Sequence, residues 1–557
     1  MLLSIALSLA ASWTQAPAQA PEAAQTPRLI VLLAIDQFIP EQLLRMESQL
    51  DGGLGRIVHQ GVRFEEAALP YSCTETGPGH ATMSTGCLPR THGIVGNRLR
   101  SRDTGETSYC VADPEARDVT DAGIGTVASV SAHNLGKPSL GDYLKAKNPA
   151  SKVFSVSGKD RSAVCMAGHH GDLALWWSDG GGFQTSTGYA QVLPGYVTRF
   201  NAGWARRFAG YVWNPSLDAE HLPPHTAPDD REGEGSFPGG GRTFPHAFEG
   251  SKDAVPEGDK RVLLSRQVQY SPVGDTITLE MARQLVVEND LGADDVPDFL
   301  GVSLSGPDKL GHTYGPYSLE VTDSIVHIDH DLAGLFQLLD ERVGADHWVL
   351  ALTADHGVLP LPESEVTIPG VESKGRIEAS AIQLAQKHVA EALAEAFGTD
   401  DKGRGLRPHF FDGDVYFELG ELKERGIDGA EARRVAAATI AKEPWVHAAY
   451  TLEQLASKDP TDDPLLGFYR NAYDPRYSAD VSVLQLPGWL KGWQTGTTHG
   501  TPYAYDRRLP LYFLGSPFRS GAVHGEAGSQ DIVPTLLHLV GIDPAGVDGH
   551  LLRSALR

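Results

Sequence analysis

The amino-acid sequence predicts an α/β fold in which helices cover both faces of a mostly parallel central sheet. The run from Leu29 to Ile35 is continuously apolar and has the length of a strand, which is typical of a strand buried on both faces. An amphipathic helix lies between Val321 and Leu339, where apolar residues recur every three or four positions. Strand and helix patterns alternate along much of the chain, which indicates βαβ units and parallel strands.

The same patterns predict the other elements in chain order. We expect strands over 62–68, 152–156, 173–177, 298–304, 348–352 and 509–514, and helices over 40–60, 275–289 and 530–539. Two stretches interrupt this order and are predicted to be insertions, at about 180–270 and 370–477. The first is rich in Gly, Pro, Asp and His, with a helix near 195–209. The second alternates strand and helix patterns and is expected to form a small α+β unit.

The composition limits the classes of partner. The chain has 557 residues, of which 41% are hydrophobic and 21% charged, so it can bury a large core. Its formal net charge of −24 makes it a poor partner for nucleic acid or anionic membranes. An anionic substrate stays compatible with this charge, because a bound metal ion can dominate the local field.

The N-terminus predicts export to the periplasm or the medium. Residues 1–24 have a short apolar run followed by small residues, as in a secretory signal peptide, and the run is too short to cross a bilayer. No later stretch is long and apolar enough for a membrane span, so we expect none in the mature protein. An exported chain can form disulfides, and four cysteines allow three pairings among which the sequence does not choose. They are Cys73, Cys87, Cys110 and Cys165.

Thr76 opens the segment T-G-P-G-H, which predicts the start of a helix. Pro78 is favoured in a first helical turn, where its missing N–H costs nothing. The free N–H groups of a helix N-terminus attract an anion, so the Thr76 hydroxyl is a candidate nucleophile. The alternative interpretation is that Thr76 only caps the helix.

Metal-type ligands follow several predicted strands. Carboxylate and imidazole groups occur together at these positions, and this mixed donor set suits zinc with sites left open for substrate. Two metals roughly 4 Å apart can stabilise the entering and leaving oxygens of a phosphoryl transfer. Taken singly, each aspartate could cap a helix and each histidine could pack in the core. The candidates are Asp36, Asp308, His312, Asp355, His356 and His499.

These motifs together resemble the alkaline phosphatase superfamily, and most closely its PafA-like branch with a threonine nucleophile. The resemblance rests on A-I-D at Asp36, T-x-T-G-P-G-H at Thr76, G-I-V-G-N at Asn97, K-D-R at 159–161, D-x-x-x-H at 308–312, A-D-H-G at 355–356 and T-H-G at His499. It runs from about Leu29 to Gly541. It implies an alkaline-phosphatase-like three-layer sandwich, with one catalytic domain over 28–557.

The resemblance also implies the site and its reaction. Asp308, His312 and His499 would hold one zinc ion. Asp36, Asp355 and His356 would hold a second, which Thr76 also contacts. Asn97, Lys159, Arg161 and the backbone N–H of Gly77 would bind the phosphoryl oxygens. The implied activity is hydrolysis of small phosphate monoesters through a phospho-threonine at Thr76, in a monomeric enzyme with two zinc ions.

Three alternatives stay open at this stage. Type I phosphodiesterases and nucleotide pyrophosphatases share the metal ligands, the threonine and the asparagine but lack the pair Lys159 and Arg161. An arylsulfatase would mature a cysteine within C-x-P-x-R, but Cys87 begins C-L-P-R, which places Arg90 one position early. A non-catalytic exported protein that binds zinc or phosphate is the third.

Overall fold

The computed structural model describes residues 26–363 and 374–557. The predicted signal peptide, residues 1–24, and the segment 370–373 of the second predicted insertion lie outside these ranges. None of the helices in the described ranges is long and apolar enough to cross a membrane. All four cysteines are free thiols, so none of the three disulfide pairings is formed.

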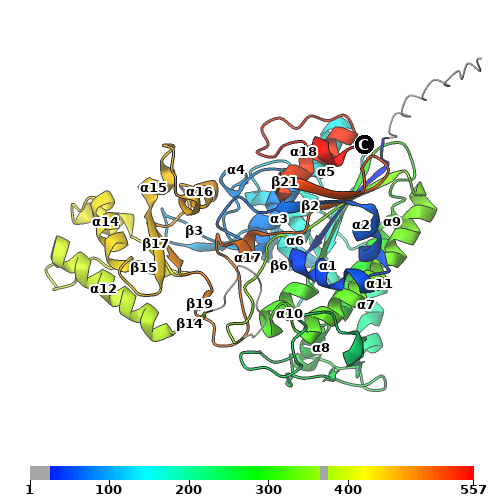
Figure 1. The fold of residues 1–557 in the computed structure, drawn as a ribbon, viewed down its shortest axis with the longest axis horizontal. Helices are drawn as coiled ribbons and strands as arrows, with labels where there is room; N and C mark the ends of the chain where they lie inside the picture. The colour runs from blue at the N-terminus through cyan, green and yellow to red at the C-terminus, as the bar shows by residue number, and fades with distance from the viewer. Residues whose placement is uncertain (1–25, 364–373) are drawn as a thin grey trace, which may run out of the picture.

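An 11-stranded sheet organises the chain (Figure 1). Its five central strands are parallel to one another, and the strands toward both ends add mainly antiparallel pairs. This arrangement confirms the predicted α/β fold. The strand order is β21 (Gly521–Ala527), β2 (Val62–Ala67), β20 (Tyr512–Leu514), β13 (Trp348–Thr353), β1 (Leu29–Ile35), β12 (Asp298–Leu304), β7 (Val153–Ser157), β8 (Leu173–Trp177), β9 (Phe183–Ser186), β5 (Ala112–Thr120) and β6 (Gly123–Val130).

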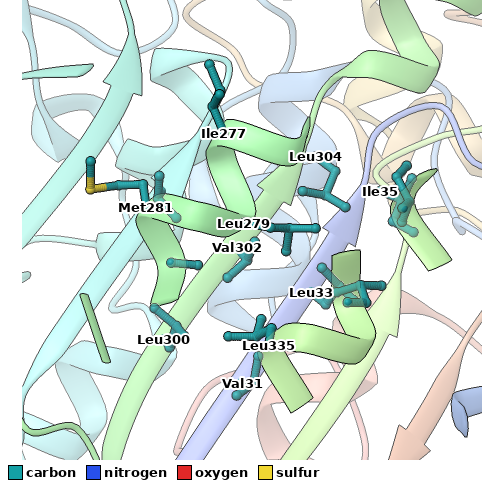
Figure 2. Close-up of a cluster of buried hydrophobic side chains, with 14 of the residues drawn as sticks. Val31, Leu33, Ile35, Ile277, Leu279, Met281, Leu300, Val302, Leu304 and Leu335 are labelled. Atoms are coloured by element: carbon teal, nitrogen blue, oxygen red, sulfur yellow. The ribbon is translucent and has the colours of Figure 1, made fainter. Parts of the chain in front are cut away.

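Strand β1 explains why the sheet needs helices on both faces. All seven of its residues are buried, and alternate side chains enter two separate hydrophobic cores. Val31, Leu33 and Ile35 pack on one face, beside side chains of β12, α9 (Pro272–Glu288) and α11 (Leu319–Leu339) (Figure 2). Ile30, Leu32 and Ala34 pack on the other face. A continuous apolar run is therefore the sequence that this central position requires.

Each face has its own helical layer. The helices on the first face include α1 (Pro40–Met46), α2 (Gly53–Gln60), α9 (Pro272–Glu288) and α11 (Leu319–Leu339). The second face is covered by α3 (Thr76–Thr85), α5 (Leu140–Lys147), α6 (Asp160–Ala167) and α18 (Ile532–Leu539). Shorter elements connect them: α4 (Pro89–His92), β3 (Arg98–Arg100), β4 (Thr107–Tyr109), α10 (Gly306–Tyr314) and α17 (Ala504–Arg507).

The expected helix over 40–60 is two helices rather than one. A 3₁₀ turn (Glu47–Gln49) follows α1, and α2 starts afresh at Gly53. The carboxylate of Asp329, on α11, accepts hydrogen bonds from the backbone N–H groups of Asp51, Gly52 and Gly55 at 2.8–3.1 Å. Asp329 thus satisfies donors that the start of α2 leaves free, which a single uninterrupted helix would not present.

The first predicted insertion lies beside α9 and α11. Its opening strand, β9, belongs to the main sheet, and the rest contains α7 (Gly195–Phe208), β10 (Val212–Trp213), β11 (His246–Ala247) and α8 (Asp259–Gln269). Aromatic side chains from α7 and β10, Trp204 and Trp213, join the core of the first face.

The second predicted insertion, together with β18 (Val481–Gln485) beyond its predicted end at residue 477, forms a four-stranded sheet and a hydrophobic core of its own, at the left of Figure 1. The sheet order is β15 (His409–Phe411), β16 (Asp414–Tyr416), β18 (Val481–Gln485) and β17 (Val446–Thr451). Its helices are α12 (Ala379–Phe397), α13 (Leu419–Glu424), α14 (Gly429–Ile440), α15 (Leu452–Ala456) and α16 (Pro464–Asn471). A parallel pair, β14 (Gly375–Ile377) and β19 (Trp489–Lys491), flanks this sheet in the chain. Because β19 follows residue 477, regular pairing extends beyond the predicted end of the insertion. The division into domains stays a prediction.

The cap that Asp329 gives α2 predicts a stability effect. Asp329→Ala leaves three buried or half-buried N–H groups without their acceptor, so we expect a loss of about 1–3 kcal/mol of unfolding free energy. Urea unfolding followed by circular dichroism measures it. His330→Ala is the control, because the next side chain on α11 is 88% exposed and its removal should change stability by less than about 0.5 kcal/mol. Equal effects of the two substitutions would contradict the capping role.

Candidate active site

Three adjacent parallel strands bring the predicted aspartates together. Strand β1 lies between β12 and β13, with Ile35 beside Leu304 and Ala34 beside Thr353. Asp36 directly follows β1, and Asp355 comes two residues after β13. Asp308 lies in the first turn of α10, just after β12. Their positions at the carboxyl ends of the strands match the usual location of active sites in such sheets.

Among the described residues, two groups of side chains bring their ligand atoms close enough together for each group to hold a metal ion. In one, atoms of Asp308, His312 and His499 all lie within 4.8 Å of one another. This is the predicted first set. In the other, Asp36 and His356 gather with Asp308, whereas the prediction has Asp355 as the third member. Asp355 is close by, with Oδ2 at 3.5 Å from His356 Nε2. The assignment of each side chain to one ion stays a prediction.

The orientation of the three histidines fits metal binding. In each ring Nδ1 faces a backbone carbonyl: Thr497 for His312 at 2.7 Å, Thr74 for His499 at 2.6 Å, and Gly357 for His356 at 3.0 Å. A carbonyl only accepts, so Nδ1 carries the proton and Nε2 offers its lone pair. Backbone orientation of this kind is a usual feature of metal-binding histidines.

Unpaired buried atoms give a second sign of a cation. Among the described residues, Asp36 Oδ1, Asp355 Oδ2 and His356 Nε2 are buried and lack a hydrogen-bond partner. Such atoms are rare in proteins, because burying a polar group without a partner costs free energy. All three belong to the predicted second metal set, so the donor set fits a cation.

Lys159 supplies positive charge among these carboxylates. Its buried ammonium group donates to Asp36 Oδ2 at 2.6 Å and also to Asp308 Oδ2. Burial, with the charges of Asp308 and Asp355, raises the pKa of Asp36 well above its ordinary value. Burial acts the same way on Asp308, but Lys159 and His312 outweigh it and hold the pKa of Asp308 well below its ordinary value. Lys159 therefore keeps part of this cluster ionised.

Thr76 is the first residue of α3, and its side chain is almost fully buried. The cap position belongs to Glu75, so the alternative that Thr76 only caps the helix is wrong. Arg161 Nη2 donates to Thr76 Oγ1 at 3.1 Å, which places a guanidinium beside the hydroxyl. The nearby hydroxyl of Thr74 donates to the Thr501 carbonyl at 3.0 Å and is already engaged.

Asn97 is held from two directions. Its side-chain Oδ1 accepts from the Gly77 N–H at 2.8 Å, and its backbone N–H donates to Glu75 Oε2 at 2.7 Å. The Asn97 amide is therefore oriented with its NH₂ group available for an anion. The Gly77 N–H, predicted to bind a phosphoryl oxygen, is engaged by Asn97.

Arg161 is held by a tyrosine that carries no recognisable signal in the sequence. Arg161 Nη1 lies 3.3 Å from the hydroxyl oxygen of Tyr109, and that hydroxyl donates to Asp160 Oδ1 at 2.6 Å. The same Asp160 oxygen accepts from the Arg161 backbone N–H at 2.7 Å. The side chains of Lys159 and Arg161 thus point into the site and do not bridge surface acids.

The remaining histidines near the motifs have structural roles. His80 is buried, with Nδ1 at 2.9 Å from the Thr76 carbonyl and Nε2 at 2.8 Å from Ser303 Oγ. It therefore packs behind Thr76. His169 lies 3.3 Å from Asp142 and does not line the cavity at the site.

Comparison with known proteins agrees with this fold and site. The family model described as type I phosphodiesterase / nucleotide pyrophosphatase matches residues 30–423. Alkaline phosphatase PafA of Elizabethkingia meningoseptica is 30% identical over 541 residues, covering 96% of this chain and 95% of the relative. Alkaline phosphatase PhoV of Synechococcus elongatus is 30% identical over 550 residues, covering 97% and 95%. The crystal structure of wild-type PafA superposes with a TM-score of 0.84 at 29% identity, covering 96% of this chain and all of that one.

The fold and site thus define a hydrolase of the alkaline phosphatase/phosphodiesterase superfamily. Within it, the chain belongs to the type I phosphodiesterase / nucleotide pyrophosphatase family, and its full length resembles PafA. The predicted resemblance is confirmed.

The contact between Tyr109 and Arg161 predicts a coupled loss of activity. Tyr109→Phe should lower kcat/KM for a phosphate monoester by about three- to tenfold, because the guanidinium loses one of its partners. The same substitution in an Arg161→Ala background should have almost no further effect. Steady-state kinetics on the four proteins measures the coupling.

The control is Tyr211→Phe, since Tyr211 lies in the first insertion and packs on Phe248. It should leave kcat/KM unchanged. Additive effects of Tyr109→Phe and Arg161→Ala would show that Tyr109 does not act through Arg161.

Proposed function

We propose that the protein is a zinc-dependent alkaline phosphatase that hydrolyses small phosphate monoesters through a phospho-threonine at Thr76. The observation that carries this proposal is the pair Lys159 and Arg161. Arg161 contacts the Thr76 hydroxyl, and Lys159 lies between two predicted metal-ligand carboxylates. The likeness to PafA and PhoV, both named alkaline phosphatases, supports it.

The metal sites would be filled as predicted. Asp308, His312 and His499 would hold one zinc ion, and Asp36, Asp355 and His356 would hold the other, next to Thr76. Bound zinc would favour the ionised form of the threonine hydroxyl and stabilise negative charge on the leaving oxygen.

The chain's own residues orient the reaction. Thr76 Oγ1 attacks phosphorus, the bond to the leaving oxygen breaks, and water later hydrolyses the phospho-threonine. The N-terminus of α3 favours negative charge at Thr76. Arg161 and the NH₂ group of Asn97 would bind the oxygens that do not leave. Because these donors are fixed by Tyr109 and by Glu75, they need little reorganisation when charge develops.

Charge explains why this site favours monoesters. A monoester presents three terminal oxygens and about two negative charges, whereas a diester presents two oxygens and about one charge. Lys159 and Arg161 therefore gain more with a monoester, in a partly buried site where charges are weakly screened. Arg161 suits this role because its planar donors can contact two oxygens at once.

A phosphodiesterase is the second candidate, because the matching family model is described by that activity. It would use the same predicted metal ligands and Thr76. An arylsulfatase is disfavoured, because Cys87 is buried just beyond the C-terminal end of α3, whereas Thr76 begins that helix. A protein that only binds zinc or phosphate would show no turnover.

The proposal includes export and a monomeric state. Export rests on residues 1–24, which have the pattern of a signal peptide, and the monomeric state rests on the resemblance to the PafA-like enzymes. The proposed substrates are small-molecule esters rather than nucleic acid, since a net charge of −24 repels a polyanion.

Metal analysis tests the two-zinc site. We expect two zinc ions per chain in the active enzyme, loss of p-nitrophenyl phosphate hydrolysis with a chelator, and recovery when zinc is added back. Thr76→Ala is the matched control: it should keep both ions but lose about 10³-fold or more in kcat, because only the nucleophile is removed. Full activity with one zinc ion, or with none, would contradict the two-metal proposal.

The pair Lys159 and Arg161 gives the test of specificity. Arg161→Ala should cost about ten- to a hundredfold in kcat/KM for p-nitrophenyl phosphate and much less for bis-p-nitrophenyl phosphate, because each charged hydrogen bond is worth roughly 1.5–3 kcal/mol. Lys159→Ala should act in the same direction. Zinc content is measured in both variants, since Lys159 contacts two predicted ligands.

Lys260→Ala is the control, because that side chain is 72% exposed and pairs with Glu249. It should leave both activities unchanged. An equal loss on monoester and diester in Arg161→Ala would favour the phosphodiesterase.

A further inference from the structure

A cavity of about 930 Å³ opens from one side of the site. Its inner end is lined by Lys159, Arg161, Asp308 and His312, and its walls include neither Thr76 nor any of the predicted second metal set. In a phosphoryl transfer the entering and leaving oxygens lie on opposite sides of phosphorus. A cavity on the side of Asp308 and His312, away from Thr76, is therefore where a leaving group would lie.

The charge of this cavity differs from that of the whole chain. Its lining contains four cationic side chains and three carboxylates, in a protein whose net charge is −24. Of the cations, Lys159 and Arg161 belong to the phosphoryl end. The other two are Lys309, which is partly buried, and Arg266, which is exposed on α8.

Arg266 is the exposed cation of the cavity wall. It projects from α8 and is exposed, and among residues 26–363 and 374–557 it has no ion-pair or hydrogen-bond partner for its guanidinium. Its neighbour on the same helix, Arg261, instead lies over the Trp204 ring at 5.0 Å. Lys309, in contrast, donates to Gln269. Of these two cations, Arg266 is thus the one whose side chain has no partner among the described residues, and arginine stays charged throughout the working pH range.

Trp493 gives the cavity a flat apolar surface. Its indole stacks on the His312 ring, with ring centroids 5.4 Å apart and planes at 7°. It is nevertheless 42% exposed, which is unusual for so large a side chain, and it lines the cavity. A leaving oxygen near His312 would place the group attached to it next to this indole.

We propose that the cavity selects leaving groups with a planar ring and a negative charge of their own, through Trp493 and Arg266. This inference rests on the proposed phosphatase function and names its substrate class. The ring would pack against the Trp493 indole, and the charged substituent would reach the Arg266 guanidinium at the mouth. Arg266 and Trp493 are specificity-determining residues in this proposal.

The test compares leaving groups of equal shape and different charge. The zinc-loaded full-length enzyme is assayed with 4-carboxyphenyl phosphate and with its neutral amide, 4-carbamoylphenyl phosphate. The ratio of the two kcat/KM values is measured in wild type, Arg266→Gln, Arg266→Lys and Arg261→Gln. Comparing variants with wild type cancels the intrinsic reactivity of the two phenols.

We expect Arg266→Gln to lower the ratio about fivefold, since an exposed charge contact is screened by water. Arg266→Lys should keep most of the ratio, and Arg261→Gln all of it. In wild type the ratio should also fall as salt is raised, which a purely structural role of Arg266 would not produce. A ratio that Arg266→Gln leaves unchanged, or lowers no more than Arg261→Gln does, overturns the charge selection.

A separate measurement tests the preference for a planar ring. Trp493→Leu should lower kcat/KM for 4-carbamoylphenyl phosphate about fivefold more than for glycerol phosphate, with zinc content checked in parallel because Trp493 stacks on His312. Equal losses on both esters overturn the role of the indole. Absence of turnover with every ester in wild type would instead refute the proposed function, so the two failures are distinguishable.

Discussion

The structure depends on the burial of several carboxylates in one small volume. Asp36 and Asp355 are fully buried and Asp308 almost so, at the ends of three neighbouring strands. Like charges at this spacing repel strongly in a low dielectric, and burial adds a desolvation cost. Lys159 offsets part of this charge, and the atoms of Asp36, Asp355 and His356 that lack a hydrogen-bond partner can accept more positive charge. The geometry of the whole site follows from the need to place positive charge next to these buried carboxylates.

The features that the sequence predicted well are those encoded locally. A continuous apolar run identifies β1 from the sequence alone. Because Asp36 directly follows that run, its place at the carboxyl end of the strand is predicted without further information. Features set by distant contacts were missed. The break after α1 depends on Asp329, nearly three hundred residues away, and the hairpin of β5 and β6 shows no regular alternation in its sequence. Tyr109 could not be recognised in the sequence, because only the folded chain brings it next to Arg161.

The two predicted insertions, or residues next to them in the chain, line the cavity beside the site. Helix α8 and the segment around Ser236, both within the first insertion, line part of the cavity, and the loop after β19, just beyond the predicted end of the second insertion, contributes Trp493. The residues predicted to hold metal and those predicted to bind the phosphoryl group all lie outside the two insertions. Chemistry and recognition are therefore supplied by different parts of the chain, which allows the recognition surface to vary while the reacting groups stay fixed.

The position of β1 has a consequence for how the chain reaches its native state. Strand β1, the first strand of the described residues, pairs with β12 and β13, which follow it by more than 260 residues. Until those strands emerge, a fully apolar segment has no partner, and closing so long a loop is slow. Unpaired apolar strands invite aggregation, so β1 is exposed to this risk until β12 and β13 have been made. Placing the partners of a central strand so far along the chain thus delays the completion of the centre of the sheet.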